Sequence, residues 1–269
     1  MSTASKISWT DATWNPARGC TKVSPGCAHC YAETFAERWR GIKGHAYEHG
    51  FDLQLVPAKL DEPLHWRKPK RVFVNSMSDL FHEGIPFEFI YQVFDVMARC
   101  PQHTFQILTK RAARMLACLS RAHDKVYDQV FLSVFLDGGR LSVGGLPWPL
   151  PNVWLGVSAE DQPHLDKRVG HLLACPAAVR FVSLEPLLGP IDLDRVTTLK
   201  RPIDWVIVGG ESGPKFRPCE IRWITDIVDQ CRMAGVPTWV KQDSGLRPGQ
   251  QGRIPDEYWV HEFPKAATQ

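Results

Sequence analysis

The sequence lacks any long hydrophobic run, and no stretch approaches the roughly 18 consecutive apolar residues of a membrane-spanning helix. Its first residues, MSTASKISWTD, lack the basic segment followed by an apolar segment that marks a secretory signal peptide. Neither sign of charge dominates: the net charge is +3, which neither favours nor excludes a nucleic-acid partner. These absences predict a soluble, cytoplasmic protein with no membrane partner.

Internal repeats and low-complexity tracts are also missing. The 269 residues, of which 44% are apolar, are enough for a sizeable core. Chains of this length often form an α/β barrel as one unit. We therefore expect a single domain over residues 1–269. The segment 121–151, with two Gly-Gly pairs and the sequence PWPLP, fits neither strand nor helix period, and we interpret it as an insertion or lid.

Short apolar runs rich in Val, Ile, Phe and Trp alternate with helical patterns along the chain. A first strand is expected before Cys20, and the other runs lie at 71–79, 104–111, 153–161, 179–186, 205–212 and 238–244. Helical spacing of apolar residues is found at 86–100, 163–174 and 219–234. Nearly continuous apolar strands are typical of parallel sheets buried on both faces. The alternation predicts an α/β fold, a full or partial TIM-type (β/α) barrel, with a doubly wound open sheet as the alternative.

Polar side chains end every one of these runs. In α/β barrels the functional site lies at the C-terminal ends of the strands, so these side chains are expected to face one site. The strand-end residues of most interest are Asp79, Lys110, Arg111, Ser158, Glu185, Glu211 and Lys241.

Eight cysteines are present, but only Cys20, Cys27 and Cys30 cluster, in a loop over residues 19–31 with the spacing Cys-x6-Cys-x2-Cys. In a reducing cytosol, clustered cysteines indicate metal binding or catalysis before disulfides. Three thiolates in one loop suit a [4Fe–4S] cluster and leave one iron open to a substrate or cofactor. The alternatives are redox or structural cysteines, or a zinc site completed by a histidine. The candidate fourth zinc ligands are His29, His45 and His49.

Aromatic residues follow the third cysteine at regular intervals. Tyr31, Phe35 and Trp39 recur every four residues, with Ala32 and Ala36 beside them. This spacing predicts an amphipathic helix. The cysteines are then expected on a loop that opens into a helix, just after the first strand.

The sequence resembles the phage-associated three-cysteine-motif family, generally described as a domain of unknown function. The match runs from Trp9 to about Gly245 and rests on GCTKVSPGCAHCYAE, FVNSMSDLFHE, LGVSAED, FVSLEPLLGPI, VIVGGESG and VKQDSG, in that order. That family is similar to radical S-adenosylmethionine barrels, including the lyases that repair spore DNA photoproducts.

The resemblance implies that Cys20, Cys27 and Cys30 ligate a [4Fe–4S] cluster and that S-adenosylmethionine binds its open iron. In such enzymes an electron, here from a reductase or flavodoxin-like donor, cleaves the sulfonium and gives a 5′-deoxyadenosyl radical. The usual spacing is Cys-x3-Cys-x2-Cys, so the first gap here is three residues longer.

The cofactor-binding residues expected from the resemblance and from the strand ends are Gly209, Gly210, Glu211, Ser158 and Glu185. The segment Gly209-Gly210-Glu211 resembles the Gly-Gly-Glu motif that contacts the methionine amino group, although here it follows a late strand and not the second. A turn-forming role for the two glycines is the alternative.

Candidate catalytic residues are Glu185, Lys110 and Asp79. Glu185 could bind the adenosyl ribose or transfer a proton. Lys110 follows a strand directly and could bind a carboxylate or phosphate. Asp79 could contact substrate or cap a helix.

A basic segment, RKPKR at 67–71, lies beside Trp66 and suits phosphate contact and base stacking. Together these features predict a radical S-adenosylmethionine enzyme, lyase or transferase-like, that acts on DNA or a nucleotide in modification or repair. The alternative is a non-catalytic protein stabilised by zinc or a cluster, which binds nucleic acid or serves as a partner protein of a phage operon.

Overall fold

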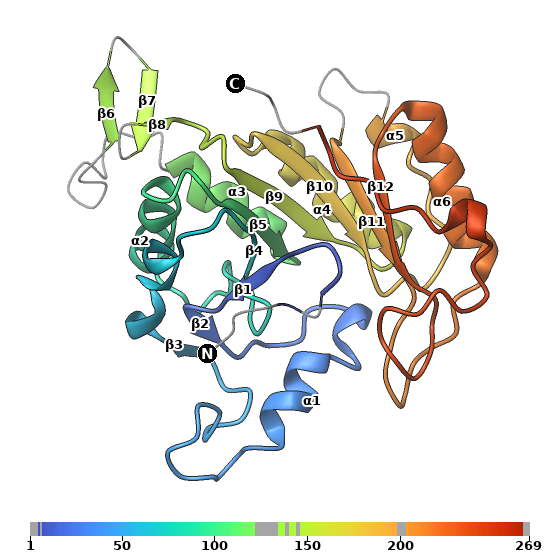
Figure 1. Cartoon of the computed structure of the whole chain (residues 1–269), viewed down its shortest axis with the longest axis horizontal. Helices are drawn as coiled ribbons and strands as arrows, with labels where there is room; N and C mark the ends of the chain where they lie inside the picture. The colour runs from blue at the N-terminus through green and yellow to red at the C-terminus, as the bar shows by residue number, and fades with distance from the viewer. Residues whose placement is uncertain are drawn as a thin grey trace.

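The computed structural model describes residues 5, 7–121, 134–137, 140–143, 146–197 and 203–265. Its centre is a seven-stranded parallel sheet with the order β1-β4-β5-β9-β10-β11-β12 (Figure 1). The strands are β1 (Ala12–Trp14), β4 (Arg71–Val74), β5 (Thr104–Thr109), β9 (Val153–Ser158), β10 (Val179–Leu184), β11 (Trp205–Gly209) and β12 (Thr238–Gln242). All seven predicted strands are therefore confirmed.

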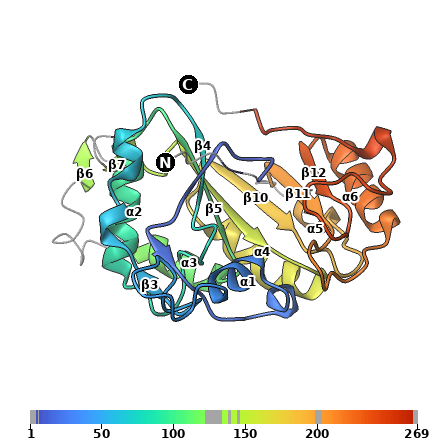
Figure 2. The same cartoon turned by 60° about the horizontal axis from the view of Figure 1, so that its bottom comes forward.

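Helices follow the strands in turn and cover the outer side of the curled sheet (Figure 2). They are α2 (Phe87–Ala98), α3 (Ala112–Arg121), α4 (Gln162–Ala174), α5 (Asp194–Thr197) and α6 (Ile221–Ala234). Sheet neighbours are also neighbours in the chain, without the reversal of a doubly wound sheet. Within the described residues no ladder joins β1 to β12, so the sheet is a half barrel, as expected for a partial (β/α) barrel.

Alternating side chains of the strands build two separate cores. Val72, Val74 and their counterparts face the helices, whereas Phe73 faces the concave side. The concave core also contains Trp9, Trp154, Val179, Phe181, Trp205, Ile207 and Trp239. Gly156 makes room for it, because a Cβ there would lie 2.5 Å from the Phe181 ring. The concave side is thus filled with aromatic rings below the C-terminal ends of the strands.

Both ends of the described chain add to this concave core. The segment 260–262 pairs with β12: Val240 N donates to Val260 O at 2.8 Å, and Glu262 N donates to Thr238 O at 2.9 Å. Phe263 then contacts Trp239, with ring centroids 4.8 Å apart. The free edge of β12 is covered in this way, which removes an exposed row of backbone hydrogen-bonding groups.

The remaining elements lie outside the half barrel. Strands β2 (Ala17–Arg18) and β3 (Gln54–Leu55) pair antiparallel, and α1 (Tyr31–Glu37) is the helix predicted after Cys30. Short 3-10 helices cover Pro25–Cys27, Pro57–Lys59, Glu62–His65 and Asp256–Tyr258. No helix within the described residues is long and apolar enough to cross a membrane.

The predicted insertion, 121–151, contains a small antiparallel sheet of β6 (Val134–Asp137), β7 (Arg140–Val143) and β8 (Leu146–Pro147). In Figure 1 this sheet stands beyond α2, away from α1. Residues 122–133, 138–139 and 144–145 of the segment lie outside the described residues. A role as a lid stays a prediction.

Candidate functional site

The cysteine loop starts at a tightly held glycine. Gly19 adopts φ 81°, and a Cβ there would lie 2.2 Å from the Asp52 carbonyl oxygen, so a side chain would not fit. Gly19 N donates to Met77 O at 2.9 Å, and Cys20 N donates to Phe51 O at 3.2 Å. The first cysteine is therefore fixed between two other loops at the C-terminal ends of the strands.

Cys20, Cys27 and Cys30 are all half-buried and free of disulfides. Arg111 Nη1 donates to Cys20 Sγ at 3.4 Å, and Ser24 Oγ lies 3.9 Å from Cys27 Sγ. Burial raises the pKa of Cys20 to about 11, even though Arg111 opposes the shift, and burial also raises the pKa of Cys30. Both groups are thiols at neutral pH unless a cation compensates the thiolate charge, as a bound metal does.

Arg111 ties the end of β5 to the cysteine loop. Its guanidinium donates to Thr21 O at 3.1 Å, to Asp79 Oδ2 at 3.2 Å and to Glu83 Oε2 at 2.8 Å. The side chain is almost fully buried. Like Lys110, Arg111 follows a strand directly, a position from which it could bind a carboxylate or phosphate, but in the structure its donors position the loop and Cys20.

Asp79, a predicted catalytic residue, is buried and fully engaged. Its carboxylate accepts hydrogen bonds from Thr109 Oγ1 at 2.7 Å, from Phe81 N at 3.0 Å and from Lys110 N at 3.1 Å, besides the Arg111 contact. It joins the ends of β4 and β5. This geometry supports a positioning role, and a catalytic role for Asp79 stays a prediction.

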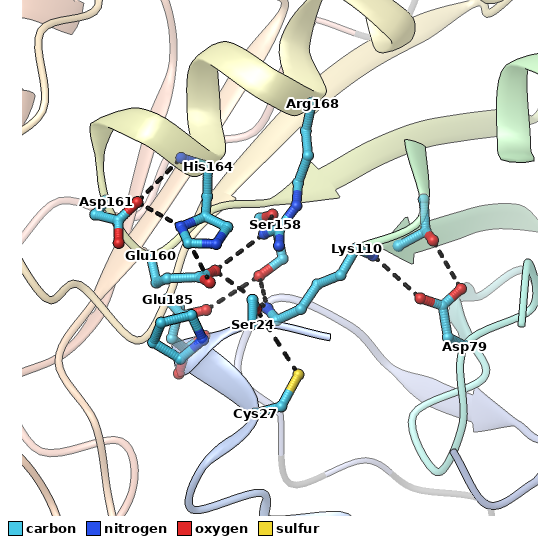
Figure 3. A network of polar contacts seen from close by, with 12 residues as sticks. Ser24, Cys27, Asp79, Lys110, Ser158, Glu160, Asp161, His164, Arg168 and Glu185 are labelled. Atoms are coloured by element: carbon cyan, nitrogen blue, oxygen red, sulfur yellow. Dashed lines mark hydrogen bonds and ion pairs between the residues drawn. The ribbon is translucent and has the colours of Figure 1, made fainter. Parts of the chain in front are cut away.

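A row of polar side chains crosses the C-terminal ends of β5, β9, β10 and β12, as the sequence predicted. Lys110 Nζ donates to Ser158 Oγ, and Ser158 Oγ donates to Glu185 O at 3.1 Å (Figure 3). At the other end of the row, Lys241 Nζ lies 2.5 Å from Glu185 Oε1, and Gln242 Nε2 lies 3.3 Å from the same oxygen. We call Lys110, Ser158, Glu185 and Lys241 the polar row.

A buried ion network lies behind the polar row. Glu160 is completely buried, and its Oε2 lies 3.0 Å from Arg168 Nη1 and 4.0 Å from Lys110 Nζ (Figure 3). Burial alone would raise the pKa of Glu160, but Lys110, Ser24 and Arg168 outweigh it and lower that pKa. Burial also lowers the pKa of Lys110, against the attraction of Glu160. The network thus joins one buried carboxylate to two cations, Arg168 and Lys110.

The cysteine loop rests directly on this network. A Cβ at Gly26 would lie 3.1 Å from the Glu160 carboxylate, so the loop backbone approaches the buried charge closely. Arg168 was not predicted as a site residue, and Glu160 was predicted only as one of the polar residues that end the strands. Glu160 is one of the strand-end carboxylates, but its pairing with an arginine on α4 becomes visible only in three dimensions.

The Gly-Gly-Glu segment reaches the cysteine loop through its glutamate. Glu211 Oε1 lies 2.6 Å from Arg217 Nη2, and Glu211 Oε2 lies 3.1 Å from His29 Nδ1. Burial would raise the pKa of Glu211, but bonds from Arg217 and His29 lower it to about 2. A Cβ at Gly210 would lie 2.4 Å from Ser244 N. Close packing thus accounts for Gly210, and Gly209 and Glu211 stay predicted cofactor ligands.

The donor set fits a thiophilic metal group. Three free thiols share one pinned loop, and Arg111 at Cys20 and Lys110 beneath the loop can offset thiolate charge. Among the described residues, no group of three or more His, Cys, Asp and Glu side chains is arranged to hold a single metal ion.

The basic segment 67–71 lies at the opposite, N-terminal end of the strands, where it leads into β4. Arg71 is the first residue of β4 and pairs with Asp11 at 3.1 Å, and Lys70 Nζ lies 5.0 Å above the Trp66 ring. Because the cysteines lie at the C-terminal ends of the strands, a nucleic acid bound at 67–71 would be remote from them.

The geometry thus combines a three-thiol loop, a polar row and a buried ion network at one end of a half barrel. Comparison with known proteins indicates no reaction for the chain, because no curated protein and no solved structure matches it. Residues 4–264 match the family described as a protein of unknown function (DUF5131), and the chain belongs to that family.

Proposed function

We propose that the chain is an iron–sulfur enzyme of the radical S-adenosylmethionine type, in which Cys20, Cys27 and Cys30 hold a [4Fe–4S] cluster. One observation carries this proposal: three free, half-buried thiols lie on a pinned loop at the C-terminal end of a parallel half barrel. In α/β barrels that end bears the functional site. The resemblance to the phage-associated three-cysteine-motif family supports the same reading.

The chain's own residues would support such a group in two ways. Arg111 donates to Cys20 and offsets part of the charge that three thiolates bring. Glu211 holds the third cysteine's neighbour, His29, and so fixes the far end of the loop. When bound, a reduced cluster supplies one electron to the sulfonium of S-adenosylmethionine, with a reductase or flavodoxin-like protein as donor.

The polar row is the proposed binding face for the cofactor and the substrate. Glu185 presents a carboxylate between Lys241 and Gln242, and it can accept hydrogen bonds from ribose hydroxyls or an ammonium group. Lys110 presents an ammonium group that suits a carboxylate or phosphate, and Ser158 holds this group in place by accepting one of its hydrogen bonds. A DNA base or a nucleotide is the proposed substrate class, in modification or repair.

A zinc-stabilised, non-catalytic protein is the second candidate, as a nucleic-acid binder or phage-operon partner. Zinc would need a fourth ligand. The ring of His29 is bonded to Glu211, and the ring of His45 stacks on Trp39 at 4.2 Å. Neither contact uses Nε2 of its ring, so either histidine, or the exposed His49, could complete a zinc site, and metal analysis separates the two candidates.

Anaerobic purification with metal analysis tests the proposal. We expect about four iron and four sulfide per chain, and production of 5′-deoxyadenosine from S-adenosylmethionine with a chemical reductant. Cys27→Ala should lose both the iron and the product. Cys118→Ala removes a buried cysteine remote from the loop and should keep both. Stoichiometric zinc in place of iron would contradict the proposal.

A further inference from the structure

Helix α1 turns its aromatic side outward. Tyr31 is 56% exposed, Phe35 is 42% exposed and Trp39, just past the helix, is 37% exposed, whereas Ala32 and Ala36 are buried. An amphipathic helix normally packs its large apolar residues against the core. Here the small residues pack inward, and exposed aromatic side chains gather directly beside the cysteine loop.

These rings are held in fixed relative positions. Phe35 and Tyr47 meet edge to face with centroids 5.5 Å apart, and Trp39 stacks on His45 at 4.2 Å. The Arg18 guanidinium lies 5.1 Å above the Tyr47 ring. We call Phe35, Trp39, His45 and Tyr47 the aromatic platform. Because its rings brace one another, a ligand can stack on it with little loss of side-chain freedom.

Positive charge borders the aromatic platform. The segment 18–50 carries five Lys and Arg side chains against three Glu. All three carboxylates are bound within the segment: Glu37 to Arg40, Glu48 to Gly44 N and Glu33 to Lys22. Within the described part of the chain no acidic side chain pairs with the exposed Arg38 or Lys43. The platform therefore offers open cations and no open carboxylate.

This combination matches single-stranded nucleic acid. Unpaired bases stack on exposed aromatic rings, and neighbouring Lys and Arg contact the phosphates. An acidic protein could pair with the Lys and Arg side chains, but it would leave the aromatic rings of the platform without a stacking partner. The basic segment 67–71 has one tryptophan beside it and lies at the opposite, N-terminal end of the strands.

We infer that the aromatic platform binds single-stranded nucleic acid and leads a nucleotide to the cysteine loop. The platform is joined to the site, since α1 begins directly after Cys30 and the Tyr31 hydroxyl donates to Ser76 O at 2.5 Å, at the end of β4. The inferred binding of single-stranded nucleic acid depends on the aromatic platform alone. Delivery for reaction rests on the proposed function.

Fluorescence anisotropy with a labelled, mixed-sequence single-stranded DNA tests the binding. We expect the full chain to bind, and the double variant Phe35→Ala/Trp39→Ala to bind about tenfold or more weakly, because each stacked base contributes strongly to affinity. Arg38→Ala/Lys43→Ala should reduce the slope of log K against log salt by about 1.4, since each phosphate contact on a single strand contributes about 0.7.

Matched variants separate stacking from loss of structure. Trp39→Phe keeps a ring and should retain most of the binding, whereas Trp39→Leu keeps apolar bulk and should lose it. Arg67→Ala/Lys68→Ala alters the opposite, N-terminal end of the strands and should bind like the wild type. Iron content is expected to be unchanged in all these variants, so failure of DNA binding and failure of the cluster proposal are distinguishable.

Two results would overturn the inference. One is equal affinity for DNA in the wild type and in Phe35→Ala/Trp39→Ala. The other is a wild-type chain that binds no single strand but self-associates through the platform, seen as a dimer in light scattering that the double variant abolishes. The second result would make the platform an interface between copies of the chain.

Discussion

At the scale of single residues, the carboxylate of Glu160 has the greatest influence on the site. It is completely buried, it pairs with both Arg168 and Lys110, and the cysteine loop contacts it at Gly26. Buried ion pairs add little net stability, but removal of one partner leaves an uncompensated charge in the interior. Glu160 is therefore a positioning residue, on which both the Lys110 end of the polar row and the cysteine loop depend.

Glu160→Gln should lower the free energy of unfolding at neutral pH by about 3 kcal/mol, because Arg168 and Lys110 lose their counter-charge. The pKa of Glu160 is lowered in the folded state, so its ionisation stabilises the fold above the ordinary value of 4.5 and this contribution is lost as the pH falls below it. The difference between variant and wild type should therefore shrink in acid. Urea unfolding from pH 7 to pH 3 measures this.

The exposed Glu257 provides the matched control. Glu257→Gln makes the same chemical change and should alter the unfolding free energy by less than about 0.5 kcal/mol. If the Glu160→Gln protein were as stable as this control at pH 7, Glu160 would not be needed to compensate the charges of Arg168 and Lys110.

At the scale of elements, the effect of a glycine on the half barrel depends on whether it lies in a strand or in a helix. Gly156 in β9 gives its space on the concave face to the Phe181 ring of β10. Gly170 in α4 is exposed and has nothing within 4 Å of a Cβ. The same residue type is thus required for packing in the strand and only weakens the helix.

The two glycines predict opposite effects of one substitution. Gly156→Ala should destabilise by about 1–3 kcal/mol, because its Cβ overpacks the ring of Phe181. Gly170→Ala should stabilise by about 0.5–1 kcal/mol through helix propensity. Thermal and urea unfolding check both, and equal shifts in the same direction would contradict the packing argument. Combining Gly156→Ala with Phe181→Leu should recover part of the loss.

The strands could be predicted from the sequence because both faces of the sheet are buried, which makes each strand a continuous apolar run. The runs around Val72, Val182 and Val206 are continuously apolar because helices cover one sheet face and aromatic rings fill the other. Convergence of Lys110, Ser158 and Glu185 followed from parallel strands alone. The exposure of Phe35 and Trp39 could not be predicted in this way. A four-residue period places both side chains on one face of a helix, but it does not show whether that face is buried or exposed. The Glu160–Arg168 pair depends on how α4 packs, which no local pattern encodes.

At the scale of the whole molecule, one sheet edge and the concave core depend on the same short segment. The segment 260–262 completes the hydrogen bonds of β12, and Phe263 packs on Trp205 and Trp239 with centroids 5.4 and 4.8 Å away. The polar site lies at the opposite end of the strands. Loss of this segment should therefore affect stability and self-association before it affects the cysteine loop.

Phe263→Ala should lower the unfolding free energy by up to about 3 kcal/mol, because a partly buried ring leaves a gap beside two tryptophans. Truncation after residue 259 should go further, since it exposes the backbone edge of β12 and promotes pairing between chains. Light scattering should then show concentration-dependent association in the truncated protein and a monodisperse Phe263→Ala protein. Iron content per folded chain should stay that of the wild type in Phe263→Ala. A truncated chain as monodisperse and as stable as the full one would mean that the edge of β12 needs no cover.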